Sequence, residues 1–299
     1  LEERVAALEG GTAALAVASG HAAQLLAFQT LLAPGDEFIA GNKLYGGSIN
    51  QFNHAFKSFG WNVVWADTDD IASFERAVSP RTKAIFIESI ANPGGIVTDI
   101  AAIAKIAKRA GVPLIVDNTL ATPYLIRPFE QGADIVIHSA TKFLGGHGNS
   151  IGGILVDGGS FDWLRGGRYP FLSQPRPEYE GIVIGEAFGN FAFAIAARVL
   201  GLRDLGPALS PFNAFLLLTG IETLPLRIQR HCDNALAVAK FLAEHPKVSW
   251  VSYPGLPGDR YYNLAQQYTP KGAGAVFTFG LKGGYEAGVA LVSGVKLFS

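Results

Sequence analysis

The feature that most constrains the fold is an alternation, between residues 36 and 157, of short apolar runs with stretches of helical periodicity. Runs rich in β-branched or aromatic residues predict six strands: "DEFIAG" (36–41), "NVVWAD" (62–67), "KAIFIES" (83–89), "PLIVDN" (113–118), "DIVIHS" (134–139) and "GGILVD" (152–157). The clearest helix between them is "IAAIAKIAKRAG" (100–111), which closes on Gly111. Apolar strands separated by helices are typical of a parallel sheet covered on both faces, so the sequence predicts an α/β protein.

The pattern changes after residue 185. Long helices are expected in "EAFGNFAFAIAARVLGL" (186–202), "PFNAFLLLTGIETL" (211–224) and "QRHCDNALAVAKFLAEH" (229–245), and two further strands in "VSWVSYPG" (248–255) and "GAVFTFGLKGG" (274–284). A helix is expected in "YEAGVALVSGV" (285–295). We place the boundary inside the helical stretch, which gives a large domain over residues 1–222 and a smaller C-terminal α+β domain over 223–299. Because the chain contains no methionine and its ends give no capping or stop signals, we expect it to be incomplete at both ends.

The bulk composition narrows the class of partner. The formal net charge is −1 and the isoelectric point is about 6.7, which argues against a partner that is a nucleic acid or an anionic membrane and favours a small molecule. No apolar run approaches the roughly 20 residues that span a bilayer, so no membrane segment is expected. The single cysteine, Cys232, is expected to be a small buried helix residue and fits a cytoplasmic, reducing compartment. The six histidines show no paired ligand spacing, so no metal site is predicted.

Chemistry-bearing residues follow several predicted strands, and in open α/β sheets ligands bind outside the carboxyl ends of the strands. Ser19 and Gly20 precede a long helix, whose start offers unpaired N–H groups to a phosphate, although an ordinary helix start has the same pattern. Asp117 ends an apolar strand, where a carboxylate pairs with a cation or caps the next turn.

Lys142 follows Asp117 by 25 residues and lies among Ser139, Thr141 and glycines. In a dry, polar-lined site a lysine can act as an amine nucleophile. The alternative interpretation is that Lys142 is an ordinary solvated charge.

Two further loops carry candidate binding residues. Tyr45 precedes two glycines and could stack on a flat ring, and Glu88 and Asn92 follow a predicted strand; packing explains the tyrosine equally well in isolation. Together the loops offer a phosphate cradle, a carboxylate, an aromatic face and a reactive lysine, which are the groups that pyridoxal 5′-phosphate requires. A dinucleotide site fits less well, because Ile151 occupies the third-glycine position of "GGHGNSI", and a P-loop triplet is absent from the sequence.

The same motifs carry a family resemblance. "LEERVAALEGG", "ASGHAAQ", "NKLYGGS", "ESIANPGG", "VDNTLATPY", "HSATKFLGGHG", "SPFNAFLLLTGIETLPLR" and "HPKVSWVSYPGL" resemble, in this order, the Cys/Met-metabolism family of fold-type I pyridoxal-phosphate enzymes. The resemblance implies an aspartate-aminotransferase-like transferase fold with a mostly parallel seven-stranded sheet. Within the family, "GNFAFAIAARVLGLRDLGP" and "SGH" are most similar to the O-acetylhomoserine sulfhydrylase branch.

Site roles are implied residue by residue. Lys142 is expected to hold the cofactor covalently and Asp117 to pair with its ring nitrogen. Tyr45 is expected to stack on the ring and to serve as the alternative acid/base group. The remaining cofactor contacts are expected from the backbone of Gly20 and His21, the hydroxyls of Ser139 and Thr141, and Ser19 and Asn92.

The implied activity is replacement of the acetoxy group of O-acetyl-L-homoserine by sulfide, or by another thiol, to give L-homocysteine and acetate in methionine biosynthesis. Methionine γ-lyase, cystathionine γ-synthase and cystathionine γ-lyase share every residue named, and a cofactor-binding fold without turnover stays open as a non-enzyme alternative. A homotetramer built as a dimer of dimers is the implied assembly. The family's Tyr-x-Arg phosphate pair and its arginine for the substrate carboxylate have no match here, so we expect substrate binding within this chain to be incomplete.

Overall fold

The computed structural model describes residues 1–297, and its centre is a seven-stranded sheet in the order β1-β9-β8-β7-β4-β2-β3. The strands are β1 (Ala13–Val17), β2 (Glu37–Gly41), β3 (Asn62–Ala66), β4 (Thr82–Glu88), β7 (Leu114–Asp117), β8 (Ile135–Ser139) and β9 (Gly153–Asp157). Neighbours from β8 to β3 pair in parallel, whereas β9 pairs antiparallel with both β8 and β1. The α/β class and the mostly parallel seven-stranded sheet are therefore confirmed.

Each of the six predicted runs forms a strand of this sheet, and β1 is the strand that periodicity missed. Its sequence, "AALAV", consists mostly of alanine and lacks the β-branched run that marks the others. The antiparallel direction of β9 has a simple cause. No helix separates it from β8, and a parallel neighbour requires a crossover of a dozen or more residues that is usually helical.

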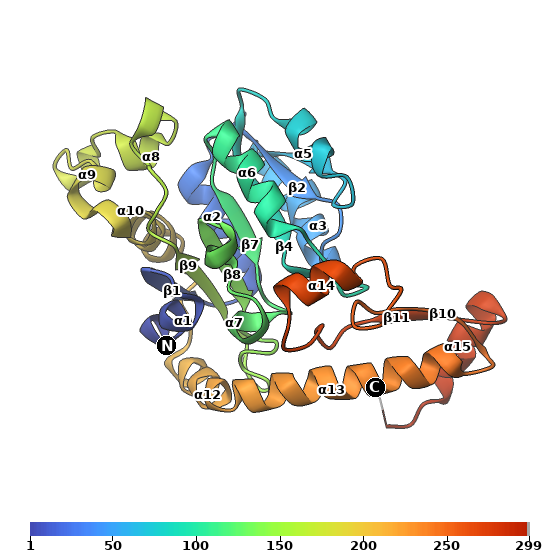
Figure 1. The fold of residues 1–299 in the computed structure, drawn as a ribbon. Helices are drawn as coiled ribbons and strands as arrows, with labels where there is room; N and C mark the ends of the chain where they lie inside the picture. The colour runs from blue at the N-terminus through green and yellow to red at the C-terminus, as the bar shows by residue number, and fades with distance from the viewer. Residues whose placement is uncertain (298–299) are drawn as a thin grey trace.

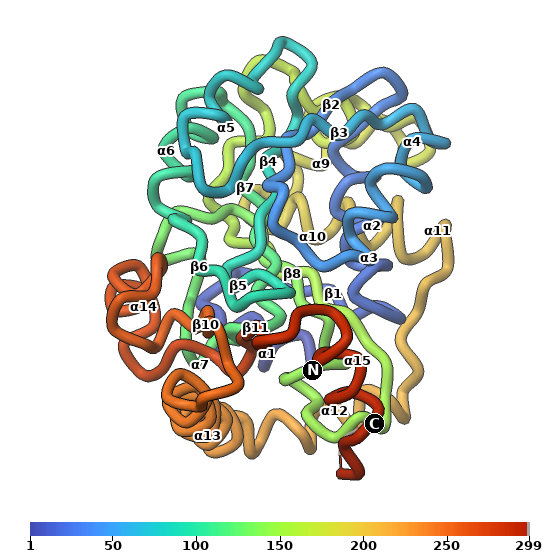
Figure 2. Tube along the Cα trace, turned by 90° about the vertical axis from the view of Figure 1, so that its right-hand side faces the viewer, coloured from blue at the N-terminus to red at the C-terminus, as the bar shows by residue number. Residues whose placement is uncertain are grey.

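Helices cover both faces of the sheet and divide its core in two (Figures 1 and 2). On one face, α1 (Glu2–Glu9) packs against β1 and β9, and α6 (Ile100–Ala110) packs against β7; both share one core with Ile85 and Ile87 of β4. On the other face, α2 (Gly20–Leu31) packs against the alternate residues, including Phe86. Because successive strand residues point to opposite faces, a strand segment buried on both sides must be apolar at every position, as Ala84–Ile87 in the middle of β4 are.

The predicted long helix over 186–202 is broken into several pieces. It consists of α9 (Ile184–Phe188), η5 (Gly189–Phe191), α10 (Ala192–Ala196), the π-helical η6 (Ala197–Leu202) and α11 (Arg203–Leu205). The break lies at Gly189, whose φ of 53° interrupts the helix. By length and composition alone the 22-residue run 184–205 could cross a membrane, contrary to the expectation that no apolar run approaches this length. Half of its apolar window is buried, and α10 packs in the same core as α2.

The C-terminal third is dominated by α12 (Pro211–Glu222) and α13 (Leu224–Glu244), which run along one edge of the molecule (Figure 1). They are followed by a two-stranded antiparallel sheet of β10 (Val248–Ser252) and β11 (Thr278–Leu281), and by α15 (Gly284–Gly294). The connection between β10 and β11 contains α14 (Tyr262–Tyr268). Cys232 is buried on α13, as expected. The domain boundary that we predict at residue 222 coincides with the junction between α12 and α13, and the division into two domains stays a prediction.

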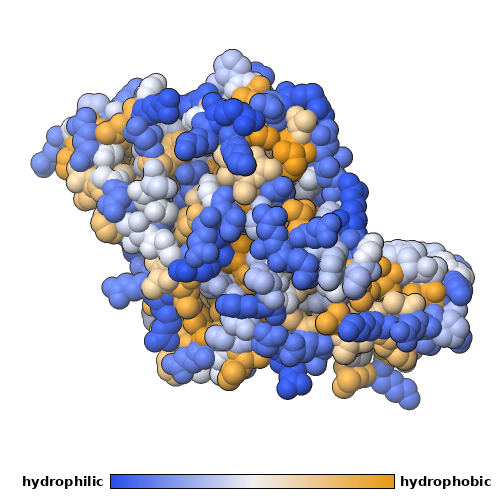
Figure 3. Space-filling model, viewed as in Figure 1, coloured by the Kyte–Doolittle hydropathy of each residue, from blue (hydrophilic) through white to orange (hydrophobic). Residues whose placement is uncertain are grey.

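Shorter elements connect these layers. They are α3 (Gly46–Asn50), η1 (Gln51–Ala55), α4 (Phe56–Ser58), α5 (Ile71–Ala77), β5 (Ile90–Ala91), β6 (Ile96–Val97), α7 (Thr122–Leu125), η2 (Pro128–Gln131), η3 (Arg165–Gly167), α8 (Pro170–Ser173) and η4 (Pro177–Tyr179). Hydrophilic side chains cover most of the face shown in Figure 3, with apolar patches between them, including one toward the C-terminal region.

Candidate active site

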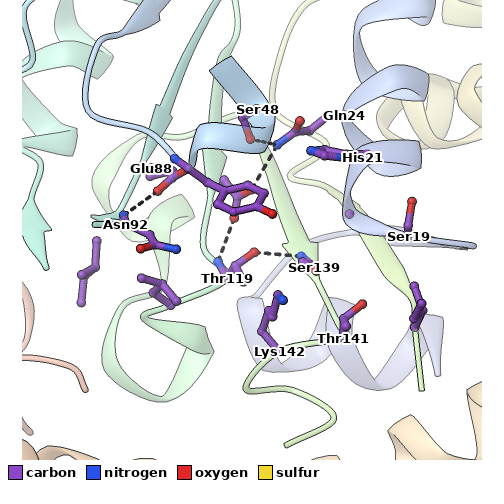
Figure 4. Close-up of a pocket in the computed structure, with 16 residues that line it drawn as sticks. Ser19, His21, Gln24, Ser48, Glu88, Asn92, Thr119, Ser139, Thr141 and Lys142 are labelled. Atoms are coloured by element: carbon purple, nitrogen blue, oxygen red, sulfur yellow. Dashed lines mark hydrogen bonds between the residues drawn. The ribbon is translucent and has the colours of Figure 1, made fainter. Parts of the chain in front are cut away.

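A cavity of about 340 Å³ opens at the carboxyl ends of β4, β7 and β8, beside the start of α2 (Figure 4). Its lining contains all nine residues that the sequence predicts for the site: Ser19, Gly20, His21, Tyr45, Asn92, Asp117, Ser139, Thr141 and Lys142. Seven further residues complete the wall: Gln24, Ser48, Glu88, Ile90, Thr119, Leu120 and Ile151. The structure therefore brings the four separate loops to one place, where ligands of open α/β sheets bind.

The start of α2 forms one end of the cavity and suits an anion. Ser19 is the N-cap, and its hydroxyl accepts a hydrogen bond from Ala22 N at 3.1 Å. The following N–H groups lack partners within the helix and carry its positive dipole end. A Cβ on Gly20 would lie 2.7 Å from Cβ of Ser139, so glycine is what lets α2 approach β8 this closely. This end of the cavity has the geometry of a phosphate site.

Asp117 lies at the end of β7 and is 8% exposed. Its Oδ1 accepts from Thr119 N at 2.9 Å, and its Oδ2 lies 3.4 Å from Nε2 of Gln24. Burial raises the pKa of Asp117 despite these hydrogen bonds. Within residues 1–297 no lysine, arginine or histidine comes within ion-pair distance of this carboxyl. A bound cation would relieve the cost of its charge, so the site suits a protonated ring nitrogen.

Lys142 lies in the turn that follows β8, with Thr141, on the opposite side of the cavity from Gln24 and Ser48 (Figure 4). The turn is closed by hydrogen bonds from Lys142 N to Ser139 O at 3.1 Å and from Gly146 N to Lys142 O at 2.7 Å. The lysine side chain is exposed to the cavity and forms no ion pair within the described part of the chain. Its amine is therefore available to a ligand.

Thr141 differs from its expected state. Its hydroxyl donates to Gly152 O at 3.2 Å and accepts from Gly152 N at 3.1 Å. This pair of contacts holds the turn against the start of β9, and a phosphate would have to compete for the hydroxyl proton. The expected phosphate contact of Thr141 therefore stays a prediction, as do the binding roles of the other eight residues.

Glu88 positions the two loops that carry Tyr45 and Asn92. Its Oε1 accepts from Tyr45 N at 2.7 Å, and its Oε2 accepts from Asn92 N at 3.1 Å. Glu88 is 5% exposed and pairs across the sheet with Asp117, so two carboxyl groups lie on neighbouring strand ends. Burial first, and the charge of Asp117 second, raise the pKa of Glu88 to about 8.

Sequence reasoning named Glu88 without giving it a role and missed three other polar wall residues. Gln24 lies four positions after Gly20 on α2, so helical spacing could have placed it on the same face. Its Nε2 donates to Ser48 Oγ at 2.9 Å. Thr119 connects the two central loops, because its hydroxyl accepts from Ser139 N at 2.8 Å while its own N–H binds Asp117. No sequence pattern marked Ser48 or Thr119.

Replacing Glu88 with glutamine is expected to flatten the pH dependence of stability of the cofactor-free protein. Between the ordinary pKa of 4.5 and about 8, the folded state keeps a proton on Glu88 that the unfolded state has lost. The free energy of unfolding therefore falls as pH rises through this window. Urea unfolding of the wild type and of Glu88→Gln between these pH values measures the two slopes. Glu3→Gln, at an exposed helix position, is the control and keeps the wild-type slope; an equal slope in Glu88→Gln would contradict the assignment.

No metal centre is formed by the side chains of residues 1–297. Across the described residues, no group of three or more His, Cys, Asp or Glu side chains is placed to hold an ion. The chemistry of the cavity is instead that of an anion-binding helix start, a buried carboxylate and a free amine.

Comparison with known proteins gives a consistent answer. A family model described as Cys/Met metabolism PLP-dependent enzyme matches residues 1–299. An O-acetyl-L-homoserine sulfhydrylase of Leptospira meyeri is 50% identical over all of this chain and 70% of its own length. A homocysteine synthase of Schizosaccharomyces pombe is 47% identical, with coverage of 100% and 70%.

Solved structures agree with these relatives. A putative O-acetylhomoserine (thiol)-lyase from Campylobacter jejuni, described as holding N′-pyridoxyl-lysine-5′-monophosphate, superposes with a TM-score of 0.96 at 38% identity. The match covers 100% of this chain and 74% of that one. An O-acetylhomoserine sulfhydrylase of Wolinella succinogenes gives a TM-score of 0.87 at 36% identity, over 99% and 82% of the two chains.

Proposed function

Because this chain belongs to the Cys/Met metabolism family of PLP-dependent enzymes, we propose that it replaces the acetoxy group of O-acetyl-L-homoserine with sulfide. The products are L-homocysteine and acetate, in methionine biosynthesis. The observation that carries the proposal is the convergence of Lys142, Asp117 and the start of α2 on one cavity. Relatives described as O-acetyl-L-homoserine sulfhydrylases match the whole chain and support the choice of substrate.

The residues present fit pyridoxal 5′-phosphate. Ser19, Gly20, His21 and Ser139 would hold its phosphate, Asp117 its ring nitrogen, and Tyr45 and Asn92 its ring face and edge. When bound, the cofactor supplies an electron sink that stabilises negative charge next to the amino group of the substrate. Two observations support this fit. The carboxylate of Asp117 is buried without a cationic partner in residues 1–297, and Gly20, which has no Cβ, lets the start of α2 lie close to Ser139.

Lys142 is the residue that we expect to move protons during the reaction. Its amine is exposed to the cavity and is carried by a short closed turn, which suits it to exchange a proton with an amino acid bound in the cavity. Tyr45 is the alternative acid/base group. Its backbone is fixed by Glu88 while 46% of the residue stays exposed, which leaves the phenol free to approach a leaving group.

Asp117 and Thr119 have positioning roles in this proposal. An ionised Asp117 would pair with the ring nitrogen of the bound cofactor, and Thr119 N orients the carboxyl group. The hydroxyl of Thr119 also accepts from Ser139 N, so this one residue links the carboxylate to the end of β8, where the turn of Lys142 begins.

Product analysis tests the choice of reaction. Purified protein with pyridoxal phosphate, O-acetyl-L-homoserine and sulfide should release homocysteine and acetate in equal amounts. With methionine or cystathionine alone, release of α-keto acid and ammonia should be absent. Lys142→Ala is the matched control and should give no product. Cleavage of methionine or cystathionine in preference to the replacement would assign the chain to a γ-lyase. Formation of cystathionine from cysteine would assign it to cystathionine γ-synthase. If the cofactor-loaded protein turned over no substrate, only a binding function would be left.

We also propose that the protein is cytoplasmic and assembles as a homotetramer built from dimers. Support for assembly comes from α12, on which Phe212 and Phe215 are 66% and 61% exposed and stack on each other at 6.4 Å. Large exposed apolar side chains of this kind are typical of protein interfaces. Light scattering measures the assembly directly: four times the chain mass supports the proposal, and a stable monomer contradicts it.

A further inference from the structure

Arg227, in the first turn of α13, is hydrogen-bonded to the loop that follows Lys142. Its Nη1 donates to Phe143 O at 2.8 Å, and its Nη2 donates to Leu144 O at 3.2 Å. Two more bonds fasten the guanidinium to the junction of α12 and α13: Nη2 to Gly220 O at 2.7 Å and Nε to Thr223 Oγ1 at 3.0 Å. The side chain of Arg227 thus joins the loop after Lys142, which belongs to the sheet domain, to the start of the C-terminal region.

All of these acceptors are neutral. In the described part of the chain no carboxylate lies within ion-pair distance of Arg227, and burial lowers the pKa of its guanidinium. Holding a cation against neutral carbonyls is costly unless its donors are all used. A planar guanidinium can supply several donors in fixed directions, which a lysine ammonium cannot. The hydrogen bonds of Arg227 therefore hold the backbone of the loop in a fixed position, and they do not neutralise the charge of the guanidinium.

The loop is shaped to receive the guanidinium. Gly146 has a φ of +72°, and a Cβ at this position would collide with Arg227 Nη1. A Cβ on Gly220 would collide with the carbonyl oxygen of Gly145, so the backbone of α12 lies directly against the loop. His231 adds a ring contact to Phe143, with centroids 5.5 Å apart.

We propose that Arg227 is a positioning residue, which acts through the turn 142–146 to present the amine of Lys142 to the cavity. Phe143, whose carbonyl it binds, is the next residue after Lys142, and Gly146 closes the turn on Lys142 O. The proposal rests on the role of Lys142 given under the proposed function. It assigns to the C-terminal region a direct effect on the chemistry of the sheet domain.

A purely structural role is the rival explanation. Gly220 O belongs to the last turn of α12, and a basic side chain that binds such a carbonyl stabilises the end of a helix. That role would change the melting temperature of the protein and leave the reaction at Lys142 unaltered. The two explanations therefore separate on kinetics and cofactor binding measured well below the melting temperature.

The test compares Arg227→Ala and Arg227→Lys with Arg230→Ala, an exposed arginine on the same helix. In the holoenzyme, Arg227→Ala is expected to lower kcat roughly 10- to 100-fold, with little change in KM for O-acetyl-L-homoserine. The dissociation constant of pyridoxal phosphate, from equilibrium dialysis, should rise about 10-fold. Arg227→Lys should recover only part of the kcat and of the cofactor affinity, because one ammonium group cannot replace the several fixed N–H donors of the guanidinium. Arg230→Ala should match the wild type.

Two results would overturn the inference. One is a lowered melting temperature in Arg227→Ala with kcat and cofactor affinity equal to the wild type. The other is full recovery of kcat by Arg227→Lys, which also decides the question if the alanine variant does not fold. Failure of the proposed function is recognised separately: the wild type itself would then turn over no substrate and would carry no cofactor on Lys142 after borohydride reduction.

Discussion

Replacing Lys142 with alanine is expected to lower turnover of O-acetyl-L-homoserine by roughly 10³-fold or more, because one amine supplies both the covalent bond and the proton transfer. The visible absorbance of the covalently held cofactor should disappear in the same variant. Absorption spectra before and after borohydride, together with an acetate-release assay, measure both effects.

Lys105→Ala, at an exposed position on α6, is the control for the loss of a lysine as such. It should keep the spectrum and the activity of the wild type. If the Lys142 variant retained the absorbance and even a tenth of the turnover, another amine would have to hold the cofactor.

The second large effect is expected from Asp117→Asn, which keeps the size of the side chain and removes its charge. Breaking a buried charge pair costs about 3–5 kcal/mol, which corresponds to a loss of roughly 150- to 5,000-fold in rate if it falls on the transition state. We therefore expect kcat to fall by this factor, while Asp117→Glu, which keeps the charge at a changed distance, recovers part of it. Steady-state kinetics of the cofactor-loaded variants measure this.

Asp134→Asn is the matched control. Asp134 is a half-buried carboxyl whose pKa desolvation raises to about 6, but it accepts from Leu114 N at the start of β7, away from the cavity lining. Its replacement should change the free energy of unfolding and leave kcat unaltered. Equal losses of kcat in the two asparagine variants would mean that Asp117 contributes only to folding.

The sequence was informative where residues have one strong physical preference. The β-branched runs predicted six strands within one or two residues of their observed ends, and Gly111, at a φ of 66°, ends α6 where expected. Strand β1 was missed because alanine has little strand preference of its own, and tertiary pairing with β9 determines its structure. The break at Gly189 was missed because one glycine within a helical pattern does not by itself fix a positive φ.

In the candidate site, too, some residues could be predicted from the sequence and others could not. Lys142, Asp117 and the start of α2 could be named as candidates, because an amine, a carboxylate and a helix start together supply the groups that one cofactor requires. Glu88, Thr119 and Arg227 could not be assigned roles, because each of them has a partner that is a backbone group of a loop distant in the sequence. Contacts of that kind leave no periodic pattern, and three-dimensional proximity alone reveals them.

The central claim is that the amine of Lys142 carries the cofactor, and peptide mass spectrometry tests it most directly. The holoenzyme is reduced with borohydride, digested and mapped. The account predicts that the peptide containing Lys142 gains the mass of a phosphopyridoxyl group and that peptides containing other lysines do not. An unmodified Lys142 peptide, with the label on another lysine or on none, would contradict it.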